Sequence, residues 1–194
     1  MAALALLLAC GSPTDQAFRG TTLPTPYSPP AVTLTDTSGQ PYDVQARLRG
    51  AAALVFFGYT HCPDVCPTVM ADAATALRAL PADVRARARV VFVSSDPHRD
   101  TPAVLRDFLG AFDFGSGTQV AGLTGDYATI TSFATAFGIP LEAPVSTAGS
   151  YEVGHGARLT GVTPAGKAPV SWLPGDGDQL VTQLKHDVPL LLTA

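Results

Sequence analysis

Two cysteines four residues apart carry the strongest chemical signal in this 194-residue sequence. Cys62 and Cys66 lie in the segment HCPDVCP, between an unbroken apolar run at 52–57 and a helical pattern of apolar residues at 66–80. This spacing places both sulfurs on one face of a helical turn, where they can close a disulfide or converge on a metal. Because a helix begins here, its dipole favours the thiolate form.

Two thiolates are soft ligands, which select Cu(I), zinc or iron–sulfur chemistry, and a third ligand would decide between these. His155 is the first candidate, because it lies between two glycines in a loop just before a late strand. The glycines let the backbone approach the thiols and leave the imidazole exposed. A loop histidine hydrogen-bonded to the backbone is an equally good interpretation. His61 is the next candidate, although a residue adjacent to a cysteine usually points away from it. His98 and His186 are expected to be solvated.

Two carboxylates lie near the cysteines. Asp64 can hydrogen-bond within the cysteine loop or tune a metal through its ligands, and it is also the expected N-cap of the following helix. Asp96 ends a central strand at the same edge of the predicted sheet, where a simple role in the turn is at least as good an explanation. Both are therefore candidates for the surroundings of the site, not for its ligands.

The apolar periodicity predicts the elements that position these residues. It predicts an α/β chain, with a thioredoxin-like order of elements, an N-terminal β-hairpin and an inserted C-terminal β-hairpin. Ligands of open α/β sheets bind at the carboxyl ends of the strands, where the cysteines fall. Thr101 or Asp100 is expected to cap the second helix. The predicted elements are a hairpin at 32–44, strands at 52–57, 88–95 and 120–123, helices at 66–80, 103–112 and 127–137, strands at 157–162 and 168–173, and a last helix at 179–192 that is interrupted or ended near Pro189.

The N-terminus predicts export. Residues 1–10 combine a short apolar run with the sequence LLAC, which is similar to a bacterial lipobox, so Cys10 is expected to be a lipid anchor. An ordinary signal peptide or a buried apolar N-terminus is the alternative. Residues 11–30 are rich in proline and are expected to form a flexible tether, which leaves 31–194 as the folded domain. The net charge is −4 without a cluster of Lys or Arg, so nucleic acid is not an expected partner.

The segments FGYTHCPDVCP at 57–67 and SDPHRDTP at 95–102 resemble two signature blocks of the Sco/SenC family of copper chaperones. The resemblance implies a thioredoxin-like domain anchored on the extracytoplasmic face of the bacterial cytoplasmic membrane. It implies copper, as Cu(I) or Cu(II), bound by Cys62, Cys66 and His155. It also implies delivery to the binuclear copper centre of cytochrome c oxidase subunit II, with other periplasmic copper carriers as further candidate partners. A glycine replaces the acidic residue that usually precedes the histidine.

Three functions would use the thiol pair differently. A copper metallochaperone needs both thiols and His155. A thiol–disulfide reductase that keeps the copper-ligand cysteines of subunit II reduced needs the same thiols without the histidine. A redox or copper sensor is the third alternative. The histidine in the expected loop and the three-residue spacing of the cysteines favour the chaperone, with thiol–disulfide oxidoreductase activity as a second use of Cys62 and Cys66.

Overall fold

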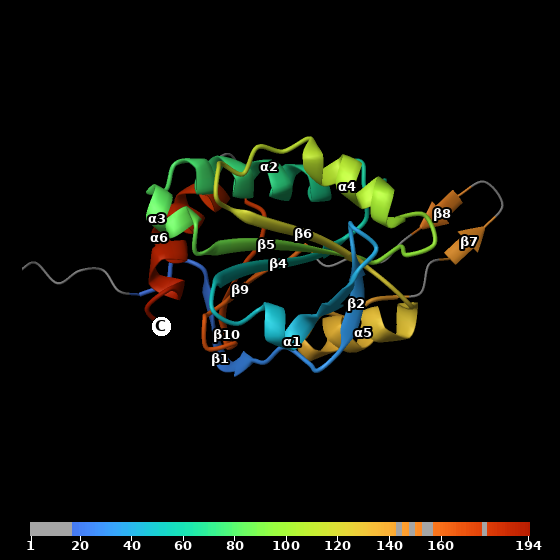
Figure 1. The fold of residues 1–194 in the computed structure, drawn as a ribbon, viewed down its shortest axis with the longest axis horizontal. Helices are drawn as coiled ribbons and strands as arrows, with labels where there is room; N and C mark the ends of the chain where they lie inside the picture. The colour runs from blue at the N-terminus through green and yellow to red at the C-terminus, as the bar shows by residue number, and fades with distance from the viewer. Residues whose placement is uncertain (1–16, 143–144, 148–149, 153–156, 176–177) are drawn as a thin grey trace, which may run out of the picture.

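The computed structural model describes residues 17–142, 145–147, 150–152, 157–175 and 178–194. These residues form an eight-stranded sheet of order β1-β10-β9-β4-β5-β6-β2-β3 and a separate hairpin of β7 and β8, which projects from the body (Figure 1). The strands are β1 (Thr21–Tyr27), β2 (Thr33–Asp36), β3 (Pro41–Asp43), β4 (Ala52–Gly58), β5 (Ala88–Ser94), β6 (Gln119–Thr124), β7 (Val145–Thr147), β8 (Ser150–Glu152), β9 (Leu159–Val162) and β10 (Ala168–Trp172). The helices are α1 (Val44–Arg47), α2 (Val65–Arg78), α3 (Ala82–Arg85), α4 (Pro102–Gly110), α5 (Tyr127–Ala136) and α6 (Gln179–Leu191).

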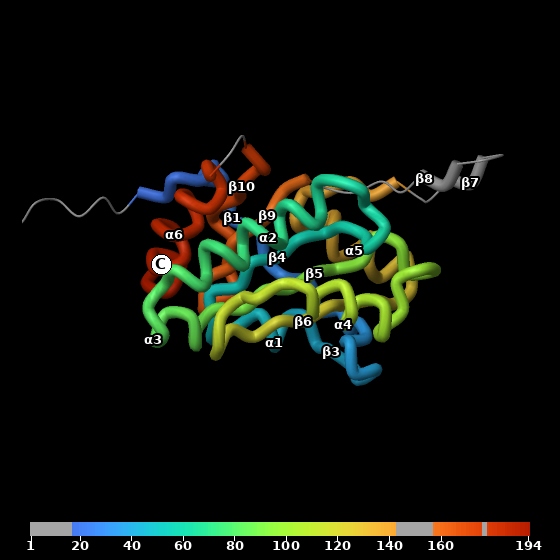
Figure 2. The backbone as a smooth tube through the Cα atoms, turned by 90° about the horizontal axis from the view of Figure 1, so that it is seen from above, coloured from blue at the N-terminus to red at the C-terminus, as the bar shows by residue number. Residues whose placement is uncertain are grey.

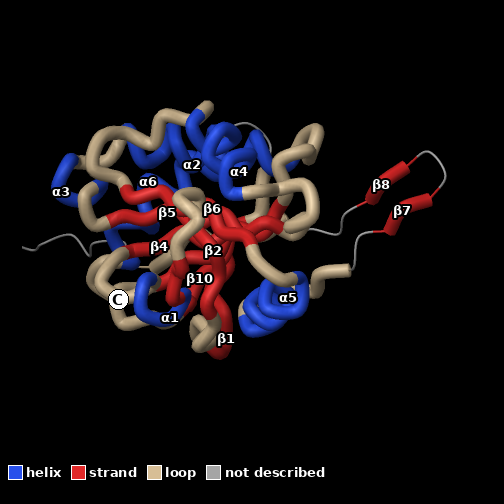
Figure 3. Tube along the Cα trace, turned by 45° about the vertical axis from the view of Figure 1, so that its right-hand side comes forward, coloured by secondary structure: helices blue, strands red, loops and turns tan. Residues whose placement is uncertain are grey.

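Three parallel strands, β4, β5 and β6, form the centre of the sheet, and β9 adds to β4 in the antiparallel direction. All seven residues of β4 are buried, as expected for a strand covered on both faces. Helices α2, α4 and α6 cover one face, and α1 and α5 cover the other (Figures 1, 2 and 3). The predicted α/β class, the N-terminal hairpin of β2 and β3 and the late hairpin of β9 and β10 are confirmed.

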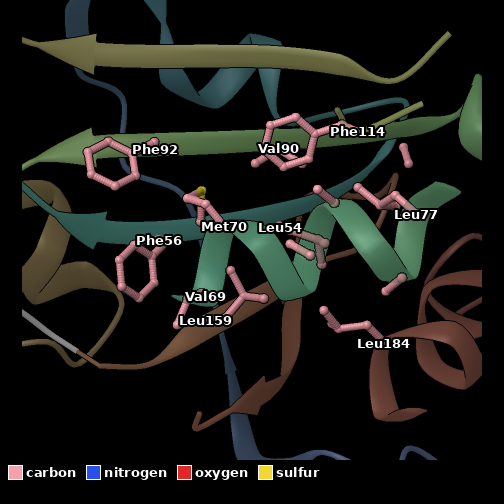
Figure 4. Close-up of a cluster of buried hydrophobic side chains, with 14 of the residues drawn as sticks. Leu54, Phe56, Val69, Met70, Leu77, Val90, Phe92, Phe114, Leu159 and Leu184 are labelled. Carbon is pink, nitrogen blue, oxygen red and sulfur yellow. The ribbon is translucent and has the colours of Figure 1, made fainter. Parts of the chain in front are cut away.

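The core on the α2 side fixes this helix over the strands that carry the site. Val69, Met70 and Leu77 are fully buried, at the helical spacing that the sequence shows. They pack with Leu54 and Leu159 in one apolar cluster (Figure 4). Each large apolar side chain removed from water in this way contributes about 1.5–3 kcal/mol, so the packing of α2 determines where its first turn lies.

The predicted tether at 11–30 is wrong over Thr21–Tyr27, because these residues form β1 and pair with β10. Proline lacks an N–H group and is tolerated on an edge strand or at a bulge. β1 is an edge strand, and its register is interrupted between Thr22 and Tyr27, the interval that contains both of its prolines. The edge of β10 supplies the partners that make this proline-rich segment part of the folded body.

The other helix boundaries agree closely with the sequence patterns. The Thr101 hydroxyl accepts a hydrogen bond from the Val104 N–H (3.3 Å) and caps α4, with Pro102 as its first residue. α6 ends at Leu191, two residues beyond Pro189, so the predicted end near this proline is confirmed and the helix is not interrupted there. A proline so close to the helix end removes only one helical hydrogen bond. Of the helices described, none is both long and apolar enough to cross a membrane.

Candidate metal centre

The cysteine loop connects the carboxyl end of β4 to the first turn of α2. Gly58 ends β4, the Cys62 N–H donates to the Tyr59 carbonyl (3.2 Å), and Cys66 lies in the first turn of the helix. Cys62 is 6% exposed and Cys66 is completely buried. The two thiols are not joined in a disulfide, and of the two only Cys62 has access to solvent.

The N-terminus of α2 provides hydrogen-bond donors for Cys62. Its sulfur accepts from the backbone N–H groups of Asp64, Val65 and Cys66, the last at 3.4 Å. These N–H groups have no partner within a helix, and they add to the positive end of its dipole. Burial acts to raise the pKa of Cys62, but these hydrogen bonds, together with one from the Cys66 thiol, lower it below its ordinary value. Cys62 is therefore the more acidic thiol of the pair.

Cys66 has the opposite character. Burial raises the pKa of its thiol far above the ordinary value, and a hydrogen bond from the Tyr59 N–H offsets only part of this rise. Donation of its S–H to Cys62 and the negative charge of Asp100 raise the pKa further. Cys66 is therefore the less acidic thiol, and its proton must be lost before it can bind a metal or attack a disulfide.

Gly58 makes room for Cys66. A Cβ atom at this position would lie 2.7 Å from the Cys66 sulfur and 2.7 Å from Cε1 of Phe56. Both distances are shorter than van der Waals contact, which for carbon atoms is about 3.5–4.0 Å. The absence of a side chain at the end of β4 is therefore required for the buried position of the second thiol.

Asp100 fixes the cysteine loop through hydrogen bonds. The sequence patterns indicated this residue only as an alternative helix cap. Its carboxylate is fully buried and accepts hydrogen bonds from the Thr60 N–H (3.1 Å), the Thr60 hydroxyl (2.6 Å) and the Ser94 hydroxyl (2.7 Å). It joins the loop to the end of β5. Its place after a central strand, at the same sheet edge as the cysteines, is the signal that could have identified it.

The two carboxylates predicted near the site, Asp64 and Asp96, make different contacts in the structure. Asp64 occupies the N-cap position of α2, but its side chain makes no capping hydrogen bond, so the predicted side-chain cap is wrong. Its contribution comes from the backbone, because its N–H donates to Cys62 and its carbonyl accepts from the Thr68 hydroxyl (2.8 Å). Asp96 is buried and ion-paired with Arg99, and its carbonyl closes the predicted turn by accepting from the Asp100 N–H (2.9 Å).

Tyr59 lies near the thiols and within reach of the Arg99 charge. Burial raises the pKa of Tyr59, and the charges of Cys62 and Cys66 and a side-chain hydrogen bond with Cys62 raise it further. The nearby Arg99 charge acts in the opposite direction. A role of Asp96 in the surroundings of the metal site stays a prediction.

The histidines separate into three groups. His61 is 56% exposed, with Nδ1 3.1 Å from the Thr60 hydroxyl and 4.0 Å from a carboxylate oxygen of Asp100. His98 is exposed, as predicted. The prediction that His186 is solvated is wrong. Its side chain is only 18% exposed, and its Nδ1 lies 2.7 Å from the buried Asp187 carboxylate. His155 lies outside the described residues, and so does Cys10.

The described residues bring together two sulfur donors but no complete metal site. Among them, no group of three or more His, Cys, Asp or Glu side chains is arranged to hold a metal ion. The two adjacent sulfurs, one of them predisposed to be a thiolate, suit a soft thiophilic ion better than a hard cation. β9 begins near the end of β4 that carries the cysteine loop, because its first residue, Leu159, pairs with Phe56.

Comparisons with known proteins agree on one family. The SCO1/SenC family model matches residues 24–183. A Stutzerimonas stutzeri protein named "Putative copper-binding protein" is 34% identical over 74% of this chain and 68% of its own length. The protein "SCO2, mitochondrial" of Saccharomyces cerevisiae is 30% identical over 69% of this chain. This chain covers only 44% of that yeast protein.

Solved structures show the same architecture. The solution structure of apo Sco1 from Thermus thermophilus has a TM-score of 0.77 and 30% identity, and the match covers 92% of this chain and 99% of that one. The structure of Bradyrhizobium japonicum ScoI with copper bound has a TM-score of 0.66 and 33% identity, covering 82% of this chain and 96% of that one. The thioredoxin-like arrangement predicted from the order of elements is therefore confirmed.

Proposed function

This chain belongs to the SCO1/SenC family, and we propose that it is a copper metallochaperone that delivers copper to the binuclear copper centre of cytochrome c oxidase subunit II. One observation carries the proposal: Cys62 and Cys66 lie in contact at the N-terminus of α2, with three backbone N–H groups directed at Cys62. This arrangement supplies two soft sulfur ligands, one of them with a lowered pKa. The copper-bound Bradyrhizobium structure and the name of the Stutzerimonas relative support copper as the metal.

His155 is the proposed third ligand. It precedes β9 by four residues, and Leu159 at the start of β9 pairs with Phe56, two residues before the end of β4. This register supports an approach of the loop to the thiols. Two thiolates and one imidazole form a trigonal set that suits copper, with a weak or open further position for exchange. Transfer then proceeds by ligand exchange with thiolates of the partner, and it starts at Cys62 because this sulfur has access to solvent.

Thiol–disulfide reduction is the second candidate function, and the unequal thiols favour it. The Cys62 thiolate attacks one sulfur of a partner disulfide, and the partner's other sulfur leaves as a thiolate. Cys66 then gives up its proton and attacks Cys62, which releases the second partner thiolate. The chain ends with a Cys62–Cys66 disulfide, and the partner has gained two electrons. This sequence of steps does not require His155.

Membrane attachment through a lipid on Cys10 is part of the proposal, with the domain on the extracytoplasmic face of a bacterial membrane. The backbone N–H groups of Arg19 and Gly20 donate to Asp187 in α6, so the folded body already includes Arg19. Eight residues separate Cys10 from Arg19, and they can span at most about 29 Å when extended. The domain would therefore remain close to the bilayer, on a tether shorter than the sequence pattern predicted.

Copper titration of the reduced full chain tests the proposal. We expect one Cu per chain, with tight binding lost in Cys62→Ser and Cys66→Ser and reduced at least tenfold in His155→Ala. His98→Ala is the matched control, because His98 is exposed and no role in binding is proposed for it. His155→Ala should leave reduction of a disulfide peptide from subunit II unchanged. Tight copper binding in the absence of both cysteines would refute the proposed site.

A further inference from the structure

One edge of the sheet is only partly covered. In the described residues, β2 pairs with β6 only at Leu123 and Thr124, whereas residues 119–123 of β6 pair with β5 on the other side. Val120 is 40% exposed, which is unusual for a large apolar residue of this protein. An edge of this kind presents backbone N–H and C=O groups that can pair with a further strand.

A small pocket with unused hydrogen-bond donors adjoins this edge, on the face of the sheet that α1 and α5 cover. Tyr42 is 3% exposed, and its hydroxyl has no hydrogen-bond partner among the described residues. Nη1 of Arg89 is also buried and unpartnered there, although Nε and Nη2 donate to the Gln119 side chain (3.0 and 2.7 Å). Buried donors without acceptors are rare in folded proteins. The pocket has a volume of about 70 Å³ and is lined by Tyr42, Arg47, Arg89, Gln119, Val120 and Ala121.

The charge in this pocket is positive. The Arg47 guanidinium lies 5.2 Å from the centre of the Tyr42 ring, and the guanidinium of Arg89 lines the same pocket. Burial raises the pKa of Tyr42, so the hydroxyl keeps its proton near neutral pH, although both arginines act to lower it and Asp36 acts to raise it. Two donors and two positive charges complement a carboxylate, and the pocket has room for a group of that size.

An apolar pocket of about 280 Å³ lies on the other face of the same edge. Leu109, Phe112 and Phe114 contribute to its wall. Along β6, Gln119 and Ala121 line the positive pocket, Gly122 lines the apolar one, and Val120 reaches both. An added strand would alternate in the same way, because successive side chains of a strand point to opposite faces.

We propose that the open edge of β6 binds an extended segment of another protein in which an apolar residue is adjacent to Asp or Glu. The segment adds to the sheet as a strand, its apolar side chain enters the larger pocket, and its carboxylate binds the Tyr42 hydroxyl and Arg89 Nη1. Arg89 pairs with Ala53, five residues before Gly58 at the end of β4, which corresponds to roughly 16 Å along the strand. This surface is separate from the thiol pair and does not depend on the copper proposal.

Fluorescence anisotropy with a labelled, end-blocked peptide of sequence TVFEVT tests this surface on the full chain. We expect saturable binding, and replacement of the peptide's Glu by Gln should weaken it about tenfold or more. Tyr42→Phe removes only the hydroxyl, and Arg89→Gln removes the donor and its charge, so each should cause a similar loss. Arg87→Gln is the matched control, because Arg87 is exposed and does not line the pocket.

The backbone part is tested by hydrogen exchange and by N-methylation of alternate peptide amides. Peptide binding should protect the amides of 119–122, and methylation on the pairing edge should abolish binding. Equal affinity for the Glu and Gln peptides would overturn the proposal, as would unchanged binding in Tyr42→Phe and Arg89→Gln. Acetate that fills the pocket while the peptide leaves β6 unprotected would identify a site for small anions only, and would equally overturn it.

Discussion

Replacement of Gly58 by alanine should disturb the thiol pair more than any other single methyl group added near it. The new Cβ would lie 2.7 Å from the Cys66 sulfur and from Cε1 of Phe56. Normal contact begins at about 3.5 Å, so each of these groups must move away from the Cβ by roughly 1 Å, or the backbone at residue 58 must shift. Both are completely buried, and neither can move toward solvent without leaving the core.

The expected cost follows from this overpacking. An extra methyl group in a well-packed core typically destabilises a protein by about 1–3 kcal/mol. We therefore expect Gly58→Ala to lower the free energy of unfolding by about 2 kcal/mol. Displacement of the Cys66 sulfur also separates it from Cys62, so copper affinity should fall at least tenfold in the protein that remains folded.

Urea unfolding followed by circular dichroism measures the stability, and copper titration below the transition measures the affinity. Gly110→Ala is the matched control. A Cβ at Gly110 meets no atom within 4 Å, and the residue is helical, so alanine there should be neutral or stabilise the protein by up to about 1 kcal/mol. If Gly58→Ala unfolds at the urea concentration of the wild type and binds copper equally well, the packing argument for Cys66 fails.

Three further predictions concern charged groups. Iodoacetamide should label Cys62 below about pH 8.5, the ordinary pKa of a thiol, because the pKa of Cys62 is lowered, whereas Cys66 should react only at higher pH. Peptide mapping by mass spectrometry gives the order of labelling, and faster labelling of Cys66 would contradict this prediction. Asp100→Ala removes the acceptor of the buried Ser94 hydroxyl and of the two partly buried Thr60 donors, and it should lower the free energy of unfolding by about 3 kcal/mol; Asp107→Ala, at an exposed residue, should leave the same urea titration unchanged. Asp187→Ala removes the acceptor of the Trp172 indole N–H (2.8 Å) and of the backbone N–H groups of Arg19 and Gly20. It should lower the free energy of unfolding by about 3 kcal/mol and speed proteolysis near residue 20. Cleavage at the wild-type rate would argue against this role.

The central strands and their helices were predictable because one local pattern dominates each of them. The apolar run of β4 and the helical spacing of Val69, Met70 and Leu77 have no competing interpretation. The cap of α4 was predictable only as Thr101 or Asp100, and the structure decides for Thr101, which is followed by proline at the first helical position. The thiol pair was identified because two cysteines at this spacing are chemically specific.

The features that the sequence missed depend on partners far away in the chain. β1 exists because the edge of β10 accepts it, and its prolines gave no local sign of this pairing. Asp187 accepts hydrogen bonds from Trp172 and from residues that precede it by more than 160 positions, so its burial has no local signal. The partner of His186 is the adjacent Asp187, and His186 became partly buried because this carboxylate is held in the core by its distant donors.

The central claim is that Cys62, Cys66 and His155 bind copper together. X-ray absorption spectroscopy of the copper-loaded full chain tests it most directly, because it counts sulfur and imidazole ligands around the metal. We predict two sulfur ligands and one imidazole in the wild type, two sulfur ligands without the imidazole in His155→Ala, and no change in His98→Ala. A spectrum with fewer than two sulfur ligands in the wild type, or an imidazole that persists in His155→Ala, would contradict the proposed site.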